Sequence, residues 1–235
     1  MFLYIMKGSL LLLGESFRMG GQGSRIRGSH ESYDEQLKAC GTHISFIESI
    51  GLTHVYLASY NTQFNDQLLD VYSRYLVGHM FYDDVIGIDN LFQRSIQQIQ
   101  DIETYDFILY LRVDLYLKPL FTQVFTPSSK TITFPTVCMI PYHRVESHPR
   151  VSDTILFIPN KYYKYMRDIK IGHDMWYDLI VNTDLTYDDL DVMISTYHDS
   201  DSEKDFNPLY YIVNRPQSST FHSHGSLFDK RLNDD

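Results

Sequence analysis

The stretch Ser9-Leu10-Leu11-Leu12-Leu13-Gly14 is a continuous apolar run that stops at a glycine. A strand covered on both faces of a parallel sheet has this uninterrupted pattern, whereas a strand with one wet face alternates. Residues 1–13 also resemble a short apolar leader, but Lys7 is their only basic residue and no small-residue cleavage site follows. The sequence therefore predicts a buried first strand at residues 9–13.

A glycine-rich loop follows this strand. Residues 14–28 contain five glycines and three arginines, which is too irregular for a helix or strand. We expect a long flexible loop with local positive charge.

An amphipathic helix is predicted after the loop. Ser32 and Glu35 have the spacing of a capping box, and apolar residues recur at three- and four-residue steps up to Ile50. Gly51 fits the C-terminal stop, and residues 54–60 then form a second β-rich run. Strand, loop, helix and strand in this order indicate a βαβ unit.

The alternation continues along the chain. Helical patterns cover residues 65–77, 91–102, 161–167 and 174–181, and strand patterns cover 105–117, 131–137 and 154–158, with an edge strand expected within 80–88. We expect a single α/β domain at 1–225 and a flexible C-terminal tail at 226–235.

Composition excludes several classes of protein. The chain has 235 residues, 43% of them hydrophobic, and a formal net charge of -10. These values are typical of a globular domain and argue against a nucleic-acid partner, which requires concentrated Lys and Arg. No stretch is long and apolar enough for a membrane-spanning helix. Cys40 and Cys138 lie in apolar surroundings and suggest no disulfide scaffold, so we expect a reducing, cytoplasmic location.

The loop after the first strand is the first candidate site. Ligands of open α/β sheets lie beyond the carboxyl ends of strands, and Arg18, Arg25 and Arg27 offer charge-assisted bonds to a diphosphate. The glycine spacing matches neither a Rossmann dinucleotide loop nor a Walker loop. A surface loop without a ligand is the alternative interpretation.

Arg112-Val113-Asp114 is the second candidate site. In an extended strand, positions two apart face the same side, so the guanidinium and the carboxylate project together. Asp114 would then meet a divalent cation or sugar hydroxyls, and Arg112 a diphosphate or an acidic side chain. A buried ion pair that satisfies itself is the alternative.

Several segments together resemble a known family. They are Gly14-Glu15-Ser16-Phe17-Arg18, Ala58-Ser59-Tyr60-Asn61-Thr62, Tyr105-Asp106-Phe107, Leu111-Arg112-Val113-Asp114-Leu115, Arg150-Val151-Ser152-Asp153 and Phe157-Ile158-Pro159. This set is similar to small GT-A-type glycosyltransferases, which occur in large DNA viruses, algae and bacteria. The resemblance implies a GT-A-like (Rossmann-like) fold with a mixed, mainly parallel sheet flanked by helices, and for a viral protein a location in the host cytoplasm.

The resemblance also implies a donor site and partners. The partners are a nucleotide-diphosphate sugar donor and a glycan acceptor; no oligomeric state is implied. The donor-binding residues would be Gly14, Ser16, Arg18, Arg25, Ser59, Asn61, Arg112 and Asp114. We expect the arginine-bearing loop to meet the strand end that holds Asp114.

The metal site is the part of the family's pattern from which this sequence departs. Asp114 would be the last residue of the family's metal-binding Asp-x-Asp motif, and His222 in an H-x-H pair would be a second ligand for manganese or magnesium. The sequence departs from the motif because Arg112 replaces the first carboxylate, and a guanidinium cannot bind a cation. The Asp83-Asp84 pair offers a replacement, although a solvated turn explains it as well.

Transfer to a sugar hydroxyl with inversion requires a carboxylate base near the acceptor. Asp153 is the first candidate, since it lies between a polar loop and an apolar strand, and Asp174 is the second, although helix capping also explains it. A methyltransferase on a doubly wound sheet and a non-catalytic glycan- or nucleotide-binding protein are the alternative functions.

Overall fold

The computed structural model describes residues 7–20, 26–126, 128–138, 148–167, 169–196 and 207–213, without the side chains of residues 137, 138, 195 and 196. Arg25, His222 and the predicted tail at 226–235 lie outside these ranges. Within them, no helix combines the length and the hydropathy that crossing a membrane requires.

The chain alternates strands with helices and short 3-10 turns. In chain order the elements are β1 (Gly8–Leu13), η1 (His30–Ser32), α1 (Tyr33–Ile50), β2 (His54–Tyr60), α2 (Asn65–Tyr72), β3 (Leu76–Tyr82), α3 (Ile88–Ile96), η2 (Ile102–Thr104), β4 (Phe107–Arg112), β5 (Leu115–Leu117), α4 (Pro119–Val124), β6 (Ile132–Cys138), β7 (Arg150–Val151), β8 (Ile155–Pro159), η4 (Asn160–Tyr165), α5 (Met175–Asn182), η5 (Tyr187–Asp189), β9 (Leu190–Thr196) and β10 (Tyr210–Ile212).

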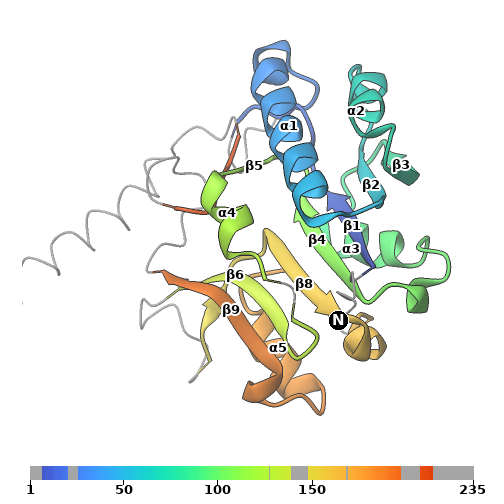
Figure 1. Ribbon diagram of the computed structural model, residues 1–235. Helices are drawn as coiled ribbons and strands as arrows, with labels where there is room; N and C mark the ends of the chain where they lie inside the picture. Colours follow the sequence, from blue (N-terminus) through green and yellow to red (C-terminus); the bar gives the residue numbers. More distant parts are fainter. Residues whose placement is uncertain are drawn as a thin grey trace, which may run out of the picture.

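A mixed sheet forms the centre of the fold (Figure 1). In the described part of the chain it has eight strands in the order β3-β2-β1-β4-β8-β6-β7, with β9 also paired to β6. Strands β1 to β4 are mutually parallel, β8 is antiparallel to β4, and β6 is antiparallel to β8. The predicted α/β fold, with a mixed sheet flanked by helices, is confirmed.

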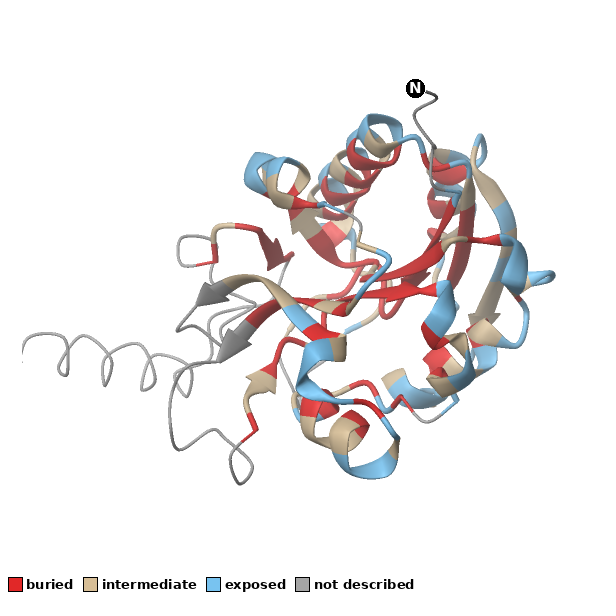
Figure 2. Cartoon of the chain, turned by 60° about the horizontal axis from the view of Figure 1, so that its bottom comes forward, coloured by how far each residue is buried: buried red, intermediate tan, exposed pale blue. Residues whose placement is uncertain are grey.

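The first strand is apolar throughout because both faces of the sheet are covered. Leu10 and Leu12 pack into the core shared with α1, α2 and α4, whereas Leu11 and Leu13 pack into the core shared with α3 and α5. All four leucines are fully buried, and Figure 2 shows the buried residues concentrated along the central strands. Period-two alternation thus separates two cores, as expected for a strand with no solvent face.

The strand predicted at residues 105–117 is two strands. Strand β4 ends at Arg112, and β5 leaves the main sheet to pair antiparallel with β10. The cause lies in the neighbouring strands, because the ladders end at the pairs Leu13–Arg112 and Leu111–Ile155. Beyond this point the Val113 N–H still donates to the carbonyl of Leu13 at 2.8 Å, and the backbone then turns through Val113 and Asp114 into β5.

The prediction of a flexible loop after β1 is wrong for its first part. Residues 14–18 are buried, and Met19 forms an antiparallel bridge with Ile26. The ring of Phe17 anchors the loop by stacking on Tyr33 and packing against Phe64. Aromatic packing therefore fixes a segment whose composition predicts mobility.

The predicted capping box is also absent. Ser32 is the N-cap of α1 but makes no side-chain cap hydrogen bond, and its hydroxyl donates to the carbonyl of Ser29 at 2.8 Å. The Ser29 hydroxyl instead accepts from the backbone N–H of Glu31. A 3-10 turn, η1, thus precedes the helix.

The other predicted elements are observed with shifted bounds. The helix predicted at 65–77 ends at Tyr72, and the segment predicted as a helix at 161–167 is the 3-10 turn η4. The predicted edge strand is β3, which begins at Leu76 and lies at one end of the sheet.

Candidate functional site

The candidate site lies where the connections of the sheet change direction. From β1 the chain passes through α1 to β2 and then β3 on one side, whereas β4 lies on the other side of β1. In open α/β sheets, ligands bind beyond the carboxyl ends of strands at such a switch point. Because Leu13 pairs with Arg112, the loop after β1 and the turn after β4 start side by side.

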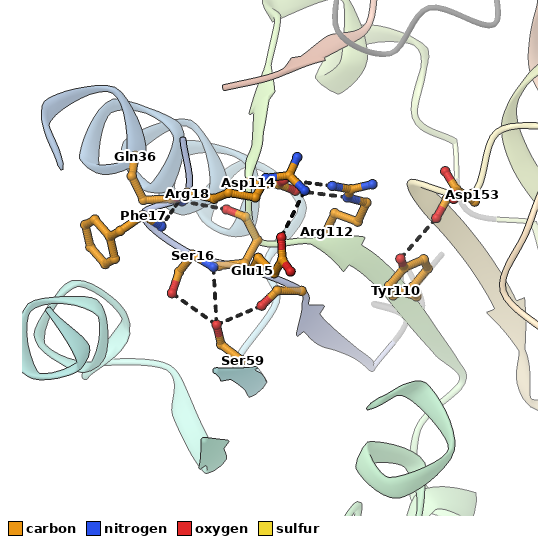
Figure 3. Close-up of polar contacts among 12 residues, drawn as sticks. Glu15, Ser16, Phe17, Arg18, Gln36, Ser59, Tyr110, Arg112, Asp114 and Asp153 are labelled. Atoms are coloured by element: carbon orange, nitrogen blue, oxygen red, sulfur yellow. Dashed lines mark hydrogen bonds and ion pairs between the residues drawn. The ribbon is translucent and has the colours of Figure 1, made fainter. Parts of the chain in front are cut away.

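Four charged side chains from these two segments form a cluster, here named the charged quartet: Glu15, Arg18, Arg112 and Asp114 (Figure 3). Arg112 donates from Nε to Oδ1 of Asp114 at 2.9 Å and from Nη2 to Oδ2 at 2.7 Å. Arg18 donates from Nη1 to Oε2 of Glu15 at 3.0 Å, and its Nη2 lies 3.3 Å from Oδ2 of Asp114. The expected meeting of the arginine-bearing loop with Asp114 is therefore observed.

The quartet has no formal net charge, since two guanidinium groups face two carboxylates, and it is largely buried. The exposed fraction is 1% for the Asp114 side chain, 4% for Arg18 and 16% for Arg112. Burial lowers the pKa of the Arg112 guanidinium, but attraction to Asp114 and the hydrogen bonds between them outweigh burial and raise the pKa above its usual value. Arg112 is thus held permanently charged, and it is the most exposed member of the quartet.

Arg18 retains donors without acceptors. Within the described part of the chain, its Nε and Nη2 atoms are buried and have no hydrogen-bond partner, the 3.3 Å contact to Asp114 being ionic only. Buried polar groups are nearly always satisfied, so orphaned donors on a cation call for an explanation such as an anionic ligand.

Serine side chains fix the start of the loop. The Ser59 hydroxyl, at the end of β2, donates to the carbonyl of Gly14 at 2.7 Å and lies 3.0 Å from the Ser16 hydroxyl. Gly14 has a φ of 120°, a conformation that side-chain-bearing residues rarely adopt. The three predicted residues Gly14, Ser16 and Ser59 are therefore brought together beneath the quartet.

Two further residues hold the loop, and the sequence analysis did not select either. Phe17 adopts a φ of 49°, which is uncommon for a bulky residue, and its N–H donates to Oε1 of Gln36 at 3.1 Å. Nε2 of the same amide donates to the carbonyl of Val113 at 2.7 Å. Gln36 thus connects the loop after β1 to the turn after β4. A fully buried amide one helical turn before Cys40 was the available signal.

Asn61 lies at the same edge of the sheet but outside the quartet. Its Nδ2 donates to Oδ1 of Asp83 at 2.6 Å, and its Oδ1 accepts from Asn65. Asp83 and Asp84 are exposed, as expected for a solvated turn.

Figure 3 shows Asp153 on the opposite side of Arg112 from Asp114 and Arg18. Its backbone carbonyl accepts from the Tyr110 hydroxyl at 3.0 Å, and its carboxylate is close enough to Arg112 to contribute to the raised pKa of that guanidinium. The candidate base thus lies near the most exposed member of the quartet, Arg112.

The carboxylate of Asp89 lies close enough to Asp153 for their charges to interact. Loss of solvation raises the pKa of Asp89, in the first turn of α3. A backbone hydrogen bond from Ile171 and the charge of Lys170 oppose this rise, and the charges of Asp178 and Asp153 add to it. The sequence analysis missed Asp89 because an acidic residue in a first helical turn already has an ordinary explanation.

Asp174 lies farther along the sheet edge. It is the N-cap residue of α5 but makes no side-chain cap hydrogen bond. Its carboxylate lies 3.7 Å from Nε of Arg150, in β7, and is 52% exposed. Asp174 therefore forms an ion pair with a basic residue of β7, which is three strands beyond β4 in the sheet.

The described residues do not fit a manganese or magnesium site. Such cations require several oxygen ligands, but both oxygens of Asp114 accept from Arg112, and Oδ2 also faces Arg18. In the ranges covered by the structure, no group of three or more His, Cys, Asp or Glu side chains is placed to hold a metal ion. His222, the other predicted ligand, lies outside those ranges.

A cavity of about 220 Å³ lies elsewhere, against strands β4, β8, β6 and β9 near the end of α4. Its lining includes Phe125, Thr133, Phe157, Asp191 and Met193. No member of the quartet lines it, so it is separate from the candidate site.

Comparison with known proteins supports the fold. The sequence matches no protein-family model and no curated protein. The structure is similar to the inositol-1-phosphate CTP transferase from T. maritima, with a TM-score of 0.55, 11% identity, and coverage of 96% of this chain and 97% of that one. It is also similar to 4-diphosphocytidyl-2C-methyl-D-erythritol synthase from Anaerococcus prevotii DSM 20548, with a TM-score of 0.51, 10% identity, and coverage of 95% and 99%.

A glycosyltransferase involved in the glycosylation of the major capsid of PBCV-1 is a more distant match, with a TM-score of 0.45, 11% identity, and coverage of 95% and 99%. At these identities the similarity concerns the fold alone. The chain has the Rossmann-like fold that nucleotidyltransferases and GT-A glycosyltransferases share.

Proposed function

We propose that this protein is a glycosyltransferase that moves a sugar from a nucleotide-diphosphate donor to a glycan acceptor. The observation that carries the proposal is the contact between Arg18 and Asp114 at the switch point of the parallel strands. This is where α/β sheets of this type receive ligands, and Arg18 has buried donors there that find no acceptor among the described residues. A diphosphate supplies oxygens that match these donors.

The proposed sugar transfer assigns a role to Arg18, Arg112 and Asp153. The bond from the anomeric carbon to the diphosphate oxygen breaks, and a bond from that carbon to the acceptor oxygen forms. Arg18 and Arg112 stabilise the negative charge that develops on the departing diphosphate. Asp153 takes the acceptor proton, since it lies on the Arg112 side of the cluster. A cytoplasmic location for this activity stays a prediction.

Thermal unfolding of the full chain against UDP-, GDP- and dTDP-sugars tests the proposal. A donor at a hundredfold excess over Kd should raise Tm by roughly 5 to 10 °C. Arg18→Ala and Arg18→Lys should abolish this shift, because neither preserves the fork of donors. Arg74→Ala is the matched control, since Arg74 is 77% exposed and pairs only with Glu48 among the described residues.

Asp153→Asn separates binding from catalysis. This variant should keep the donor-induced shift and lose sugar transfer. Stabilisation by CTP alone or by S-adenosylmethionine alone would replace the proposal with a nucleotidyltransferase or a methyltransferase. Donor binding without sugar release from any donor would indicate a non-catalytic binding protein.

A further inference from the structure

The position that carries the first metal ligand in Asp-x-Asp proteins holds a guanidinium in this chain. Arg112 ends β4, Asp114 lies in the following turn, and the pair is joined by two parallel hydrogen bonds of 2.9 and 2.7 Å. Bidentate pairing of this kind fixes the orientation of a guanidinium as well as its charge.

The Arg112–Asp114 pair is equivalent in charge to a divalent cation held by two carboxylates. Two carboxylates with one divalent cation have no net charge and present positive charge to a ligand. The Arg112–Asp114 pair also has no net charge, and Arg112 is its exposed part, with 16% of its side chain accessible against 1% for Asp114. Two of the five N–H donors of Arg112 bond to Asp114, which leaves the other edges of the guanidinium to face a ligand.

Arg18 reinforces this arrangement from the loop after β1. Its Nη2 lies 3.3 Å from the same Oδ2 atom that accepts from Arg112. The Asp114 carboxylate therefore holds two guanidinium groups, and Figure 3 shows both directed at it. A cation that approached Asp114 would have to displace one of them.

We infer that Arg112, oriented by Asp114 and supported by Arg18, takes the place of the divalent cation, so that this protein binds nucleoside diphosphates without a metal. The inference rests on the proposed function, because it concerns the same donor site. It assigns Arg112 to direct contact with the diphosphate and Asp114 to positioning of Arg112.

Calorimetric titration of the full chain with UDP, GDP, CDP and dTDP tests the inference. In the wild type, Kd for the bound diphosphate should be the same, within about twofold, in EDTA and in Mn²⁺. Arg112→Gln should weaken binding by roughly tenfold or more, because a charge-assisted bond is lost, and Mn²⁺ should not restore it. Arg112→Lys should recover part of the affinity, since it keeps the charge without the fork.

Arg112→Asp provides the converse test, because it creates the Asp-x-Asp spacing. Titration with Mn²⁺ alone should show no binding to the wild type and binding to this variant. Diphosphate binding to the variant should require Mn²⁺. If Arg112→Asp does not fold, the wild-type comparison and Arg112→Gln still decide the question.

The outcomes separate the two proposals. Wild-type binding of a diphosphate that disappears in EDTA, or Mn²⁺ binding to the wild type at the Asp114 site, overturns the inference and leaves the proposed function in place. Failure of all four diphosphates to bind, with and without Mn²⁺, overturns the proposed function and the inference together.

Discussion

Two buried polar clusters lie close to the turn after β4, and their hydrogen-bonding groups are satisfied to different degrees. In the cluster under α1, Nδ1 of His43 lies 2.7 Å from the Tyr72 hydroxyl and Nε2 lies 2.7 Å from the carbonyl of Leu115. A carbonyl only accepts, so Nε2 carries the proton and Nδ1 accepts from Tyr72. The charged quartet, in contrast, contains charged groups and two donor atoms of Arg18 that have no hydrogen-bond partner in the part of the chain that the structure describes.

The difference distinguishes a structural cluster from a candidate binding site. The His43 cluster is neutral at pH 7, because burial lowers the pKa of His43 to about 4. Both ring nitrogens of His43 have hydrogen-bond partners within the protein. Such a network holds elements together and has no donor to offer a ligand. The quartet holds ionised groups below the surface and retains donors, which is the arrangement expected where a charged ligand completes the site.

The largest effect should follow the loss of Asp114. Asp114→Asn removes the carboxylate that compensates Arg18 and Arg112, and breaking a buried pair in this way costs roughly 3 to 5 kcal/mol of the free energy of unfolding. Denaturant unfolding measures this loss. A saturating diphosphate should restore part of the lost stability if the quartet is an anion site. The double variant Asp114→Asn/Arg112→Gln should lose less stability than the two single variants lose in sum.

Glu48→Gln is the matched control for an ion pair in water. Glu48 lies 3.4 Å from Arg74, but the two side chains are 53% and 77% exposed. This substitution should change stability by less than about 1 kcal/mol. Equal losses for Asp114→Asn and Glu48→Gln would show that the quartet is no more coupled than a surface pair.

Sequence patterns predicted the strands of the sheet better than they predicted the side-chain contacts between distant segments. The continuous apolar run at 9–13 predicted β1 because burial on both faces favours apolar residues at successive positions, and the β-rich run at 54–60 predicted β2. The break between β4 and β5 was not predictable locally, since it occurs where the neighbouring strands end. The ion pair of Arg112 with Asp114 was the alternative interpretation of this motif, and its strand geometry was wrong, because β4 ends at Arg112 and Asp114 lies in the following turn. The meeting of the arginine-bearing loop with Asp114 was expected, but the atoms that join Arg18 to Asp114 depend on the fold.

Gln36 illustrates the same limit for the candidate site. It bonds to Val113, which is 77 positions away in the sequence, and to Phe17. A single polar residue on an apolar helix face shows that something is unusual but does not identify its partners. Such contacts depend on which loops the fold brings together.

The His43 cluster should give a medium effect that depends on pH. The pKa of His43 is about 4 in the folded protein, against an ordinary value of 6.5 in the unfolded chain, so between these values the unfolded chain binds a proton that the folded chain does not. Stability should therefore fall as the pH falls from 6.5 to about 4, by roughly 3 kcal/mol from this group. Above pH 6.5 its contribution is constant.

Denaturant unfolding at several pH values measures this dependence. His43→Gln should be less stable than the wild type at pH 7 but should lack the part of the slope that belongs to His43. An unchanged slope between pH 4 and 6.5 in His43→Gln would contradict a neutral buried imidazole.

The smallest effect should come from Gln36, which joins the loop after β1 to the turn after β4. Gln36→Leu removes the acceptor for the Phe17 N–H and the donor to Val113, both of which are buried, so stability should fall by about 1 to 3 kcal/mol. Gln67→Leu on the exposed face of α2 is the control and should change stability by less than about 0.5 kcal/mol. Hydrogen exchange at the Phe17 amide should accelerate in Gln36→Leu alone, because the left-handed conformation at Phe17 then loses its hydrogen bond. If this amide remains protected, aromatic packing of Phe17 holds the loop without the hydrogen bond to Gln36.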